Sequence, residues 1–221
     1  MIRLAVLLLL LGAAPAGAQL MLYEQRLPEG FGFVRFASAL PDAATIRPDF
    51  GPAVPVGVEG AERVSAYQVA EGAKQRPIRL TVEEAGQPSR TVEVPISADF
   101  STVVLRRDGA TLSHAVTADE VAFNQTRARL SFFHLIPGCA NGALTLEQGN
   151  QAVFSNMAPD TMRMRSVNPT AATVRASCAT ARAAPLPLGR LEAGGLYSVW
   201  FMAPRGEPVA FLARDTIAPR R

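Results

Sequence analysis

The chain is poor in the residues from which most enzyme sites are built. It contains only two histidines and two cysteines among 221 residues, and neither a Gly-x-Ser-x-Gly segment nor a Gly-rich loop for phosphate. A serine hydrolase needs its serine beside a base histidine and an orienting carboxylate. The adjacent pairs Glu83-Glu84 and Asp119-Glu120 would face opposite sides of a strand, so they could not act together on one sugar. We interpret these carboxylates as solvated turn charges, and we predict a protein that is not an enzyme and uses no metal or cofactor.

Lysine is almost missing as well. Lys74 is the only lysine among the 22 lysine and arginine residues, and the formal net charge is +3. The sequence has no dense basic run, which argues against a nucleic-acid partner. An excess of arginine suits partners that carry carboxylates, because the planar guanidinium pairs with a carboxylate through two parallel hydrogen bonds. A biased genomic base composition is the alternative explanation.

Long apolar runs are confined to residues 1–18. After Met1-Ile2-Arg3, an apolar run covers residues 4–11, and Ala16-Gly17-Ala18 matches a small-x-small cleavage site. This is the pattern of a secretory signal peptide, and the run is shorter than the about 20 apolar residues that span a membrane. We therefore predict cleavage near Ala18 and a periplasmic location without a direct membrane anchor. A buried N-terminal helix is the alternative.

Cys139 and Cys178 both lie well inside the predicted exported chain. An oxidising compartment makes a disulfide between them the expected state. Two other interpretations stay open at this point. One is a nucleophilic Cys139 assisted by His134, and the other is a zinc site completed by His114 and His134, although the spacing matches no common zinc pattern.

Apolar and polar residues alternate along most of the chain. Ile78, Leu80 and Val82 share one side of a predicted strand, and the same period recurs in residues 92–96, 144–146, 197–201 and 209–213. Turn-forming segments such as Arg107-Asp108-Gly109 separate these runs. The pattern predicts an all-β chain of the antiparallel β-sandwich type. Residues 117–123 are expected to form either a short helix or a linker.

The pattern is also doubled. Residues 33–41 and 130–137 are both apolar strands that run into a proline turn, and each half later contains a very apolar strand, at 102–105 and 196–202. We predict two tandem antiparallel β-sandwich domains, at residues 22–118 and 127–216, after the cleaved signal peptide at 1–18. One larger sandwich is the alternative.

Four arginines of the predicted second domain form a candidate binding face: Arg163, Arg165, Arg175 and Arg182. Alternation places the first two on one side of a strand. Such a row of guanidinium groups suits carboxylates on a polyuronate or on an acidic protein surface. The alternative is an ordinary solvent-facing side of a sandwich.

Several short motifs occur in a definite order. They are Leu22-Tyr23-Glu24, Phe33-Val34-Arg35-Phe36, Val64-Ser65-Ala66-Tyr67, Ser131-Phe132-Phe133-His134-Leu135, Val167-Asn168-Pro169, and a Leu-x-x-Gly-x-x-Tyr-Ser-Val stretch at residues 191–199. In this order they resemble the AlgF family, periplasmic accessory proteins of alginate O-acetylation. The cysteine pair departs from the family pattern, which leaves the identity of the polymer open.

The resemblance implies two β-sandwich domains without a catalytic centre. It further implies a non-catalytic periplasmic adaptor that bridges or organises a membrane-bound O-acyltransferase and SGNH-like periplasmic acetyltransferases during O-acetylation of an alginate-like exopolysaccharide. Two alternatives come from the residues themselves. One is a periplasmic carbohydrate-binding module that holds an anionic polysaccharide with its arginine face. The other is an acyl-transferring enzyme that uses Cys139 or Ser131 near His134. A weak acetyl relay on a surface side chain also stays open.

Overall fold

The computed structural model describes residues 30–120 and 124–219. The predicted signal peptide and the start of the mature chain lie outside the described residues. Within the described part, the helix present is too short to cross a membrane.

Each half of the chain forms eight strands in the described residues. The first half contains β1 (Gly32–Ala39), β2 (Ala44–Pro48), β3 (Val54–Val56), the 3-10 helix η1 (Gly60–Arg63), β4 (Gln68–Ala70), β5 (Ile78–Glu84), β6 (Arg90–Val94), β7 (Phe100–Asp108) and β8 (Thr111–Ala118). The second half contains β9 (Ala128–His134), β10 (Gly142–Leu146), β11 (Ala152–Met157), β12 (Thr161–Val167), β13 (Ala171–Ser177), β14 (Leu186–Arg190), β15 (Leu196–Met202) and β16 (Val209–Arg214). The all-β prediction is confirmed.

The two halves have the same topology. In the first, an inner sheet has the order β4-β1-β7-β8 and an outer sheet the order β3-β2-β5-β6. In the second, the inner sheet is β12-β9-β15-β16 and the outer sheet β11-β10-β13-β14, which is the same order strand for strand. Each inner sheet contains one parallel pair, β1 with β7 and β9 with β15, and the remaining pairs are antiparallel. The predicted duplication therefore extends to strand order and direction.

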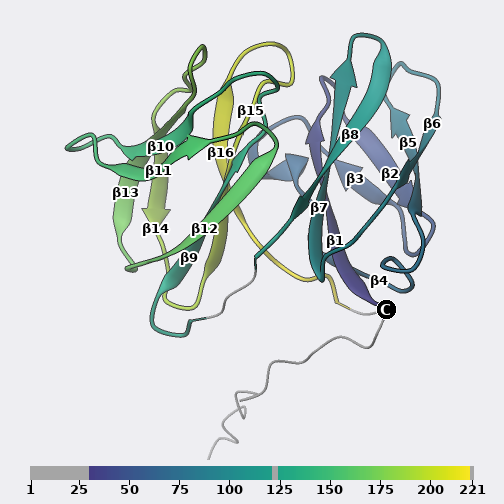
Figure 1. Ribbon diagram of the computed structural model, residues 1–221, viewed down its shortest axis with the longest axis horizontal. Coiled ribbons are helices and arrows are strands. Elements are labelled where there is room, and N and C mark those ends of the chain that lie inside the picture. The colour runs from purple at the N-terminus through teal and green to yellow at the C-terminus, as the bar shows by residue number, and fades with distance from the viewer. Residues whose placement is uncertain (1–29, 121–123, 220–221) are drawn as a thin grey trace, which may run out of the picture.

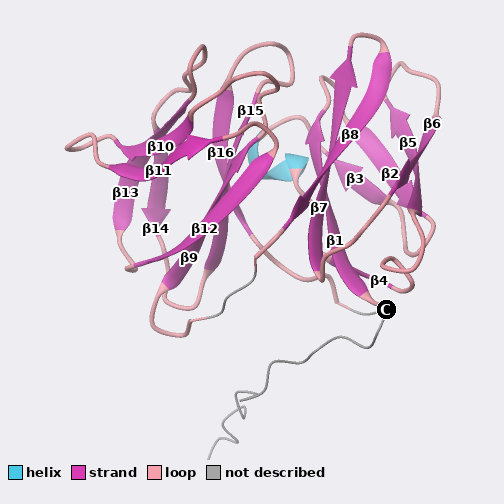
Figure 2. Cartoon of the chain, in the orientation of Figure 1, coloured by secondary structure: helices cyan, strands magenta, loops and turns pink. Residues whose placement is uncertain are grey.

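The four sheets stack as four layers, with the two inner sheets facing each other (Figures 1 and 2). One apolar core fills each sandwich, and a third lies between the inner sheets. Trp200 and Phe133 are central to the third core, where their rings stack with centroids 4.0 Å apart. Trp200 and Met202 are thus part of the contact between the two halves.

Position in this stack explains the burial of each strand. β5 belongs to an outer sheet and alternates as predicted, with Ile78, Leu80 and Val82 buried. β9 and β15 belong to an inner sheet that is covered on both faces, so both sides of these strands are buried. A strand covered on both faces needs apolar residues at successive positions.

One segment differs from the sequence prediction, and one contact was not predicted. Thr117 and Ala118 complete β8, so a helix beginning there is wrong, and residues 121–123 lie outside the described part. The chain beyond β16 returns to the first half, where Tyr67 forms backbone hydrogen bonds with Thr216 and Ala218. This tail therefore joins the two halves as well.

Candidate functional site

Four charged side chains are buried between the two inner sheets: Arg35, Asp119, Arg129 and Asp215. Each residue is at most 9% exposed. Arg35 lies on β1 and Arg129 on β9, whereas the aspartates directly follow β8 and β16. We call these four residues, with the hydroxyl groups that bond to them, the interface network. Since a buried charge is stable only when it is paired and hydrogen-bonded, its partners determine what the network does.

Arg35 connects the halves. Its Nε donates to the Thr102 hydroxyl at 2.8 Å, and its Nη1 donates to Asp215 at 2.6 Å. Its Nη2 lies 3.5 Å from a carboxylate oxygen of Asp119. Thr102 and Asp119 belong to the first half and Asp215 follows the last strand of the second, so one guanidinium bridges both.

Three aromatic rings surround the same guanidinium. Its central carbon lies 4.4 Å from the centroid of Tyr67, 4.9 Å from that of Trp200 and 5.1 Å from that of Phe133. The faces of such rings attract a cation, most strongly where water is excluded. This cage allows an arginine to occupy an otherwise apolar interface.

The two aspartates occupy equivalent positions of the duplicated fold. Thr102 donates a hydrogen bond to Asp119, and Ser198, at the equivalent position of β15, donates to Asp215 at 2.6 Å. The backbone N–H of each aspartate also bonds to the carbonyl at the start of β7 or β15. Arg129 donates to Asp215 at 2.7 Å, so this carboxylate accepts from two arginines.

The equivalent aspartates differ in acidity. Burial raises the pKa of Asp119 above its ordinary value of 3.8, and it outweighs the opposing effect of Arg35 and two hydroxyl groups. Burial acts in the same direction on Asp215, but Arg35, Ser198 and Arg129 outweigh it and lower the pKa. Asp215 is therefore the better-stabilised anion of the two.

The interpretation of the paired carboxylates as solvated charges is wrong for Asp119 and Glu84. Asp119 belongs to the interface network, and Glu84 is 6% exposed and accepts from Arg107 Nε at 2.9 Å. Glu83 does face solvent, paired with Arg47, so the two neighbours point to opposite sides as predicted. In the sequence, charged residues at strand ends look like solvent-exposed turn residues. In the structure, contacts with distant parts of the chain bury Glu84 and Asp119.

The network is closed to solvent, so it holds the halves together and offers no surface to a ligand. Sequence reasoning missed it because its members are distant along the chain. Two signals were present: Arg35 interrupts an apolar strand, and Thr102 and Asp119 recur as Ser198 and Asp215 at one constant offset.

Arg163 and Arg165 lie on the edge strand β12, as neighbours on one side of it. Arg163 Nη1 donates to the carbonyl of Ser155 at 3.2 Å, and Arg165 Nη1 donates to that of Val153 at 3.0 Å. Both acceptors lie on β11, the edge strand of the other sheet. These side chains thus cross the open side of the second sandwich.

Arg175 and Arg182 lie elsewhere, on the second outer sheet and the loop beyond it. Arg175 Nε donates to Glu147 at 2.8 Å, and this hydrogen bond lowers the pKa of Glu147. Both arginines line a polar hollow of about 200 Å³ together with Thr145, Asn150 and Ser177. The four arginines of the predicted binding face therefore form two pairs rather than one row.

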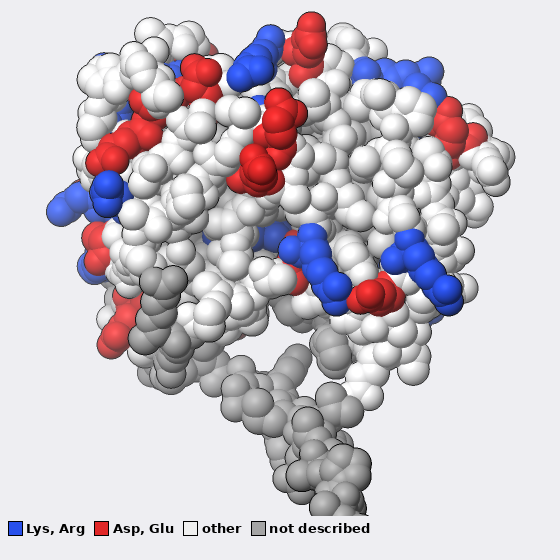
Figure 3. All heavy atoms as spheres, turned by 180° about the vertical axis from the view of Figure 1, so that it is seen from behind, with Lys and Arg blue, Asp and Glu red and all other residues white. Residues whose placement is uncertain are grey.

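Larger hollows lie at equivalent places in the two halves. One of about 670 Å³ lies between β3 and β4, and one of about 500 Å³ lies between β11 and β12. In both cases the hollow separates the edge strands of the outer and inner sheets. On the face seen from behind, basic and acidic side chains are interspersed rather than gathered by sign (Figure 3).

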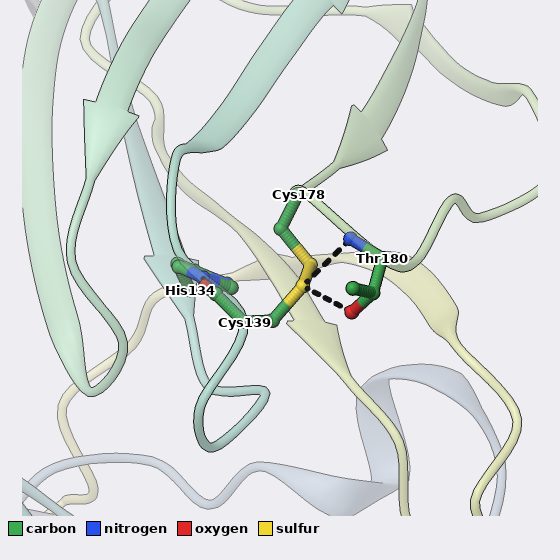
Figure 4. Close-up of a disulfide and its surroundings, with 4 residues drawn as sticks. All are labelled: His134, Cys139, Cys178 and Thr180. Atoms are coloured by element: carbon green, nitrogen blue, oxygen red, sulfur yellow. Dashed lines mark hydrogen bonds between the residues drawn. A yellow bond between two sulfur atoms is a disulfide. The ribbon is translucent and has the colours of Figure 1, made fainter.

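The disulfide between Cys139 and Cys178 is present (Figure 4). Cys139 Sγ accepts hydrogen bonds from the backbone N–H and the hydroxyl of Thr180. His134 is fully buried, and its Nε2 donates to the carbonyl of Cys139 at 2.6 Å. His134 stacks with Phe201 in the second core, whereas Ser131 lies an odd number of positions away on β9 and faces the opposite side. The structure does not bring Ser131 and His134 together.

Among residues 30–120 and 124–219, no cluster of three or more histidine, cysteine, aspartate or glutamate side chains has the arrangement of a metal site. His114, named above as a possible zinc ligand, lies within β8. Both cysteines are engaged in the disulfide of the second half.

Comparison with known proteins gave limited likeness. No family model matches the sequence, and no curated protein matches it. Among solved structures, the C-terminal domain of AlgF from P. aeruginosa aligns with a TM-score of 0.34 and 14% identity, covering 40% of this chain and 98% of that domain. The CBM26 carbohydrate-binding module of Eubacterium rectale Amy13K, in complex with maltoheptaose, aligns with a TM-score of 0.29 and 10% identity, covering 86% of this chain and 98% of that module.

Proposed function

We propose that this chain is an exported, non-catalytic adaptor in the O-acetylation of an alginate-like exopolysaccharide. In this role it bridges a membrane-bound O-acyltransferase and SGNH-like periplasmic acetyltransferases. The interface network is the observation that carries the proposal. Since Arg35 ties both halves through buried contacts, the two outer sheets keep a fixed separation. Two binding surfaces at a fixed separation give one partner a high effective concentration beside the other when that separation matches the distance between their sites.

The sequence motifs support the same role. Residues from four of the motifs that resemble the AlgF family are members of the interface network or its aromatic cage: Arg35, Tyr67, Phe133 and Ser198. The motifs therefore coincide with the residues that join the halves. This is the expectation for a protein whose function depends on its assembled shape.

The side chains with reactive chemistry are used inside the fold. Cys139 and Cys178 form the disulfide, and His134 donates to a backbone carbonyl in a fully buried position. A general base must reach the proton that it removes. These contacts favour binding over group transfer as the activity of the described part of the chain.

The direct test is recovery of the partners. We expect the tagged chain, crosslinked in native membranes, to co-purify with a membrane O-acyltransferase and with an SGNH-like protein. Recovery of neither, combined with unchanged acetylation of the polymer in a strain that lacks this chain, would rule the adaptor out.

A second candidate function is binding of an anionic polysaccharide. The polar hollow beside Arg175 and Arg182 favours it, because hydroxyl, amide and guanidinium groups converge there, and Glu147, the carboxylate in its described lining, is already paired with Arg175. Binding of a polyuronate should weaken with added salt and with Arg182→Ala, since screening reduces exposed charge pairs. Arg79→Ala, a change on the first outer sheet, is the matched control. Binding that is insensitive to both salt and Arg182→Ala would eliminate this candidate.

A further inference from the structure

The hollow between β11 and β12 opens into the core of the second sandwich. Its floor is formed by buried aliphatic side chains, among them Leu130, Val174 and Leu188, and its walls include Leu146 and Val167. The described lining contains no aromatic ring. The polar lining residues Gln151, Asn168 and Thr170 are exposed, so sugar hydroxyl groups placed against the buried floor itself would lack partners there, which is unfavourable. A flexible aliphatic chain fills such a space without that penalty.

Two arginines stand at the rim. Arg127 is exposed, and Arg165 uses one N–H for the Val153 carbonyl, which leaves the other donors of its guanidinium for a ligand. Among the residues that the structure describes, no aspartate or glutamate lines this hollow. The rim is therefore positive above an apolar interior.

The duplicated fold supplies an internal comparison. β1 pairs with β4 in the same register as β9 with β12, so Phe31 corresponds to Arg127 and Gln68 to Arg165. The equivalent hollow of the first half is lined by those neutral residues, by Phe50 and by one acid, Glu71. Both cations are thus particular to the second hollow, although the two hollows have the same position in the fold.

We infer that the hollow between β11 and β12 binds a free single-chain amphiphile with a carboxylate head, such as a medium-chain fatty acid. The aliphatic chain enters between the sheets and the carboxylate pairs with Arg127 and Arg165. Charge-assisted hydrogen bonds to guanidinium are the strong ones, so they fix the orientation of the ligand. This inference is independent of the adaptor role.

The test uses decanoate below its micelle-forming concentration, with titration calorimetry on the intact exported chain. Decanoate should bind, and decyltrimethylammonium should not. Arg127→Ala and Arg165→Ala should each weaken binding by about tenfold, because each removes a charge-assisted pair. Ala152→Phe places a ring at the mouth from an exposed position of β11, so it should abolish binding while leaving both arginines. Arg79→Ala should bind as the wild type does.

Several outcomes would overturn the inference. The first is absence of decanoate binding to the wild type. The second is decanoate binding that neither arginine variant nor Ala152→Phe weakens. A third is binding of a uronate oligosaccharide that Ala152→Phe abolishes while decanoate does not bind, because the occupant would then be a sugar.

Discussion

At the scale of single residues, the contact between the two halves depends on Arg35. Its guanidinium lies beside two equivalent aspartates, Asp119 and Asp215. Arg35 has no charged counterpart in the second half, where Ser131 takes its position in the duplicated register. Arg129 instead balances the second aspartate. The duplicated interface has thus become asymmetric in its charges, with one arginine shared between the halves.

Replacing Arg35 with methionine tests this arrangement. We expect Arg35→Met to lower the free energy of unfolding by about 3–5 kcal/mol, because it removes the arginine beside the buried carboxylate of Asp119 and leaves Asp215 with Arg129 alone. Urea denaturation followed by far-UV circular dichroism measures the loss. Arg79→Ala, which removes an exposed arginine, should change stability little. Equal stability of the two variants would contradict the role of Arg35.

The two aspartates should respond oppositely to pH. The pKa of Asp215 is lowered, so its contribution is present above its unfolded pKa and is lost as the pH falls through the folded value. The pKa of Asp119 is raised, so its contribution is present at low pH and is lost as the pH rises through the folded value. Asp215→Asn should therefore cost about 3 kcal/mol near pH 7 and less near pH 3.5.

Asp119→Asn should have a small effect near pH 7 and should lose stability relative to the wild type as the pH is lowered. The measurement is urea denaturation of both variants and the wild type at the two pH values. A larger loss for Asp119→Asn than for Asp215→Asn near pH 7 would show that the acidities are assigned the wrong way round.

At the scale of elements, close strand contacts and a covalent link shape the second sandwich. A β-carbon at Gly142, on β10, would collide with the buried ring of His134 on β9. Gly142→Ala should therefore lower stability by about 1–3 kcal/mol, as overpacking does in dense cores. Thermal unfolding compared with that of Gly86→Ala would check it, since a β-carbon at Gly86 meets no atom within 4 Å. Gly86 has a positive φ of 74°, so its change carries only a backbone cost.

The disulfide joins the β9–β10 connection to the end of β13. It closes a loop between residues 39 positions apart. Replacing both cysteines with serine should cost about 4 kcal/mol, because the unfolded chain regains the freedom that the bridge removes. Denaturation of the double variant, beside the wild type with and without reductant, gives the value. No stability difference between the oxidised wild type and the double variant would contradict it.

The sequence predicted the elements better than it predicted their contacts. Period-two patterns identified strands such as β5 and β15, and the motif pair at residues 33–41 and 130–137 revealed the duplication. The sequence did not predict that the two inner sheets pack against each other, because a strand of apolar residues can be buried on one side or on both. The interface network was not predicted for a second reason: Arg35 and Asp215 are 180 positions apart along the chain.

At the scale of the whole molecule, the two sandwiches resemble the subunits of a dimer joined in one chain. β12 packs near β8 and β16 near η1, so opposite edges of the inner sheets meet in a reciprocal way. Such reciprocity is typical of a twofold interface. The two halves nevertheless differ in sequence, as the charges beside the two equivalent hollows illustrate.

Divergent halves in a fixed relative position suit a protein that brings two different partners together. Three features hold the halves in this relative position: the interface network, the third core, and the tail that pairs with Tyr67. The proposed adaptor role follows from the assembled shape rather than from any single reactive group.

The most direct test of this role is the O-acetyl content of the exported polysaccharide in a strain that lacks the chain. We predict that acetylation is lost, although the amount of polymer is unchanged, and that the wild-type gene restores it. Acetyl content equal to that of the parent strain would contradict the proposed function.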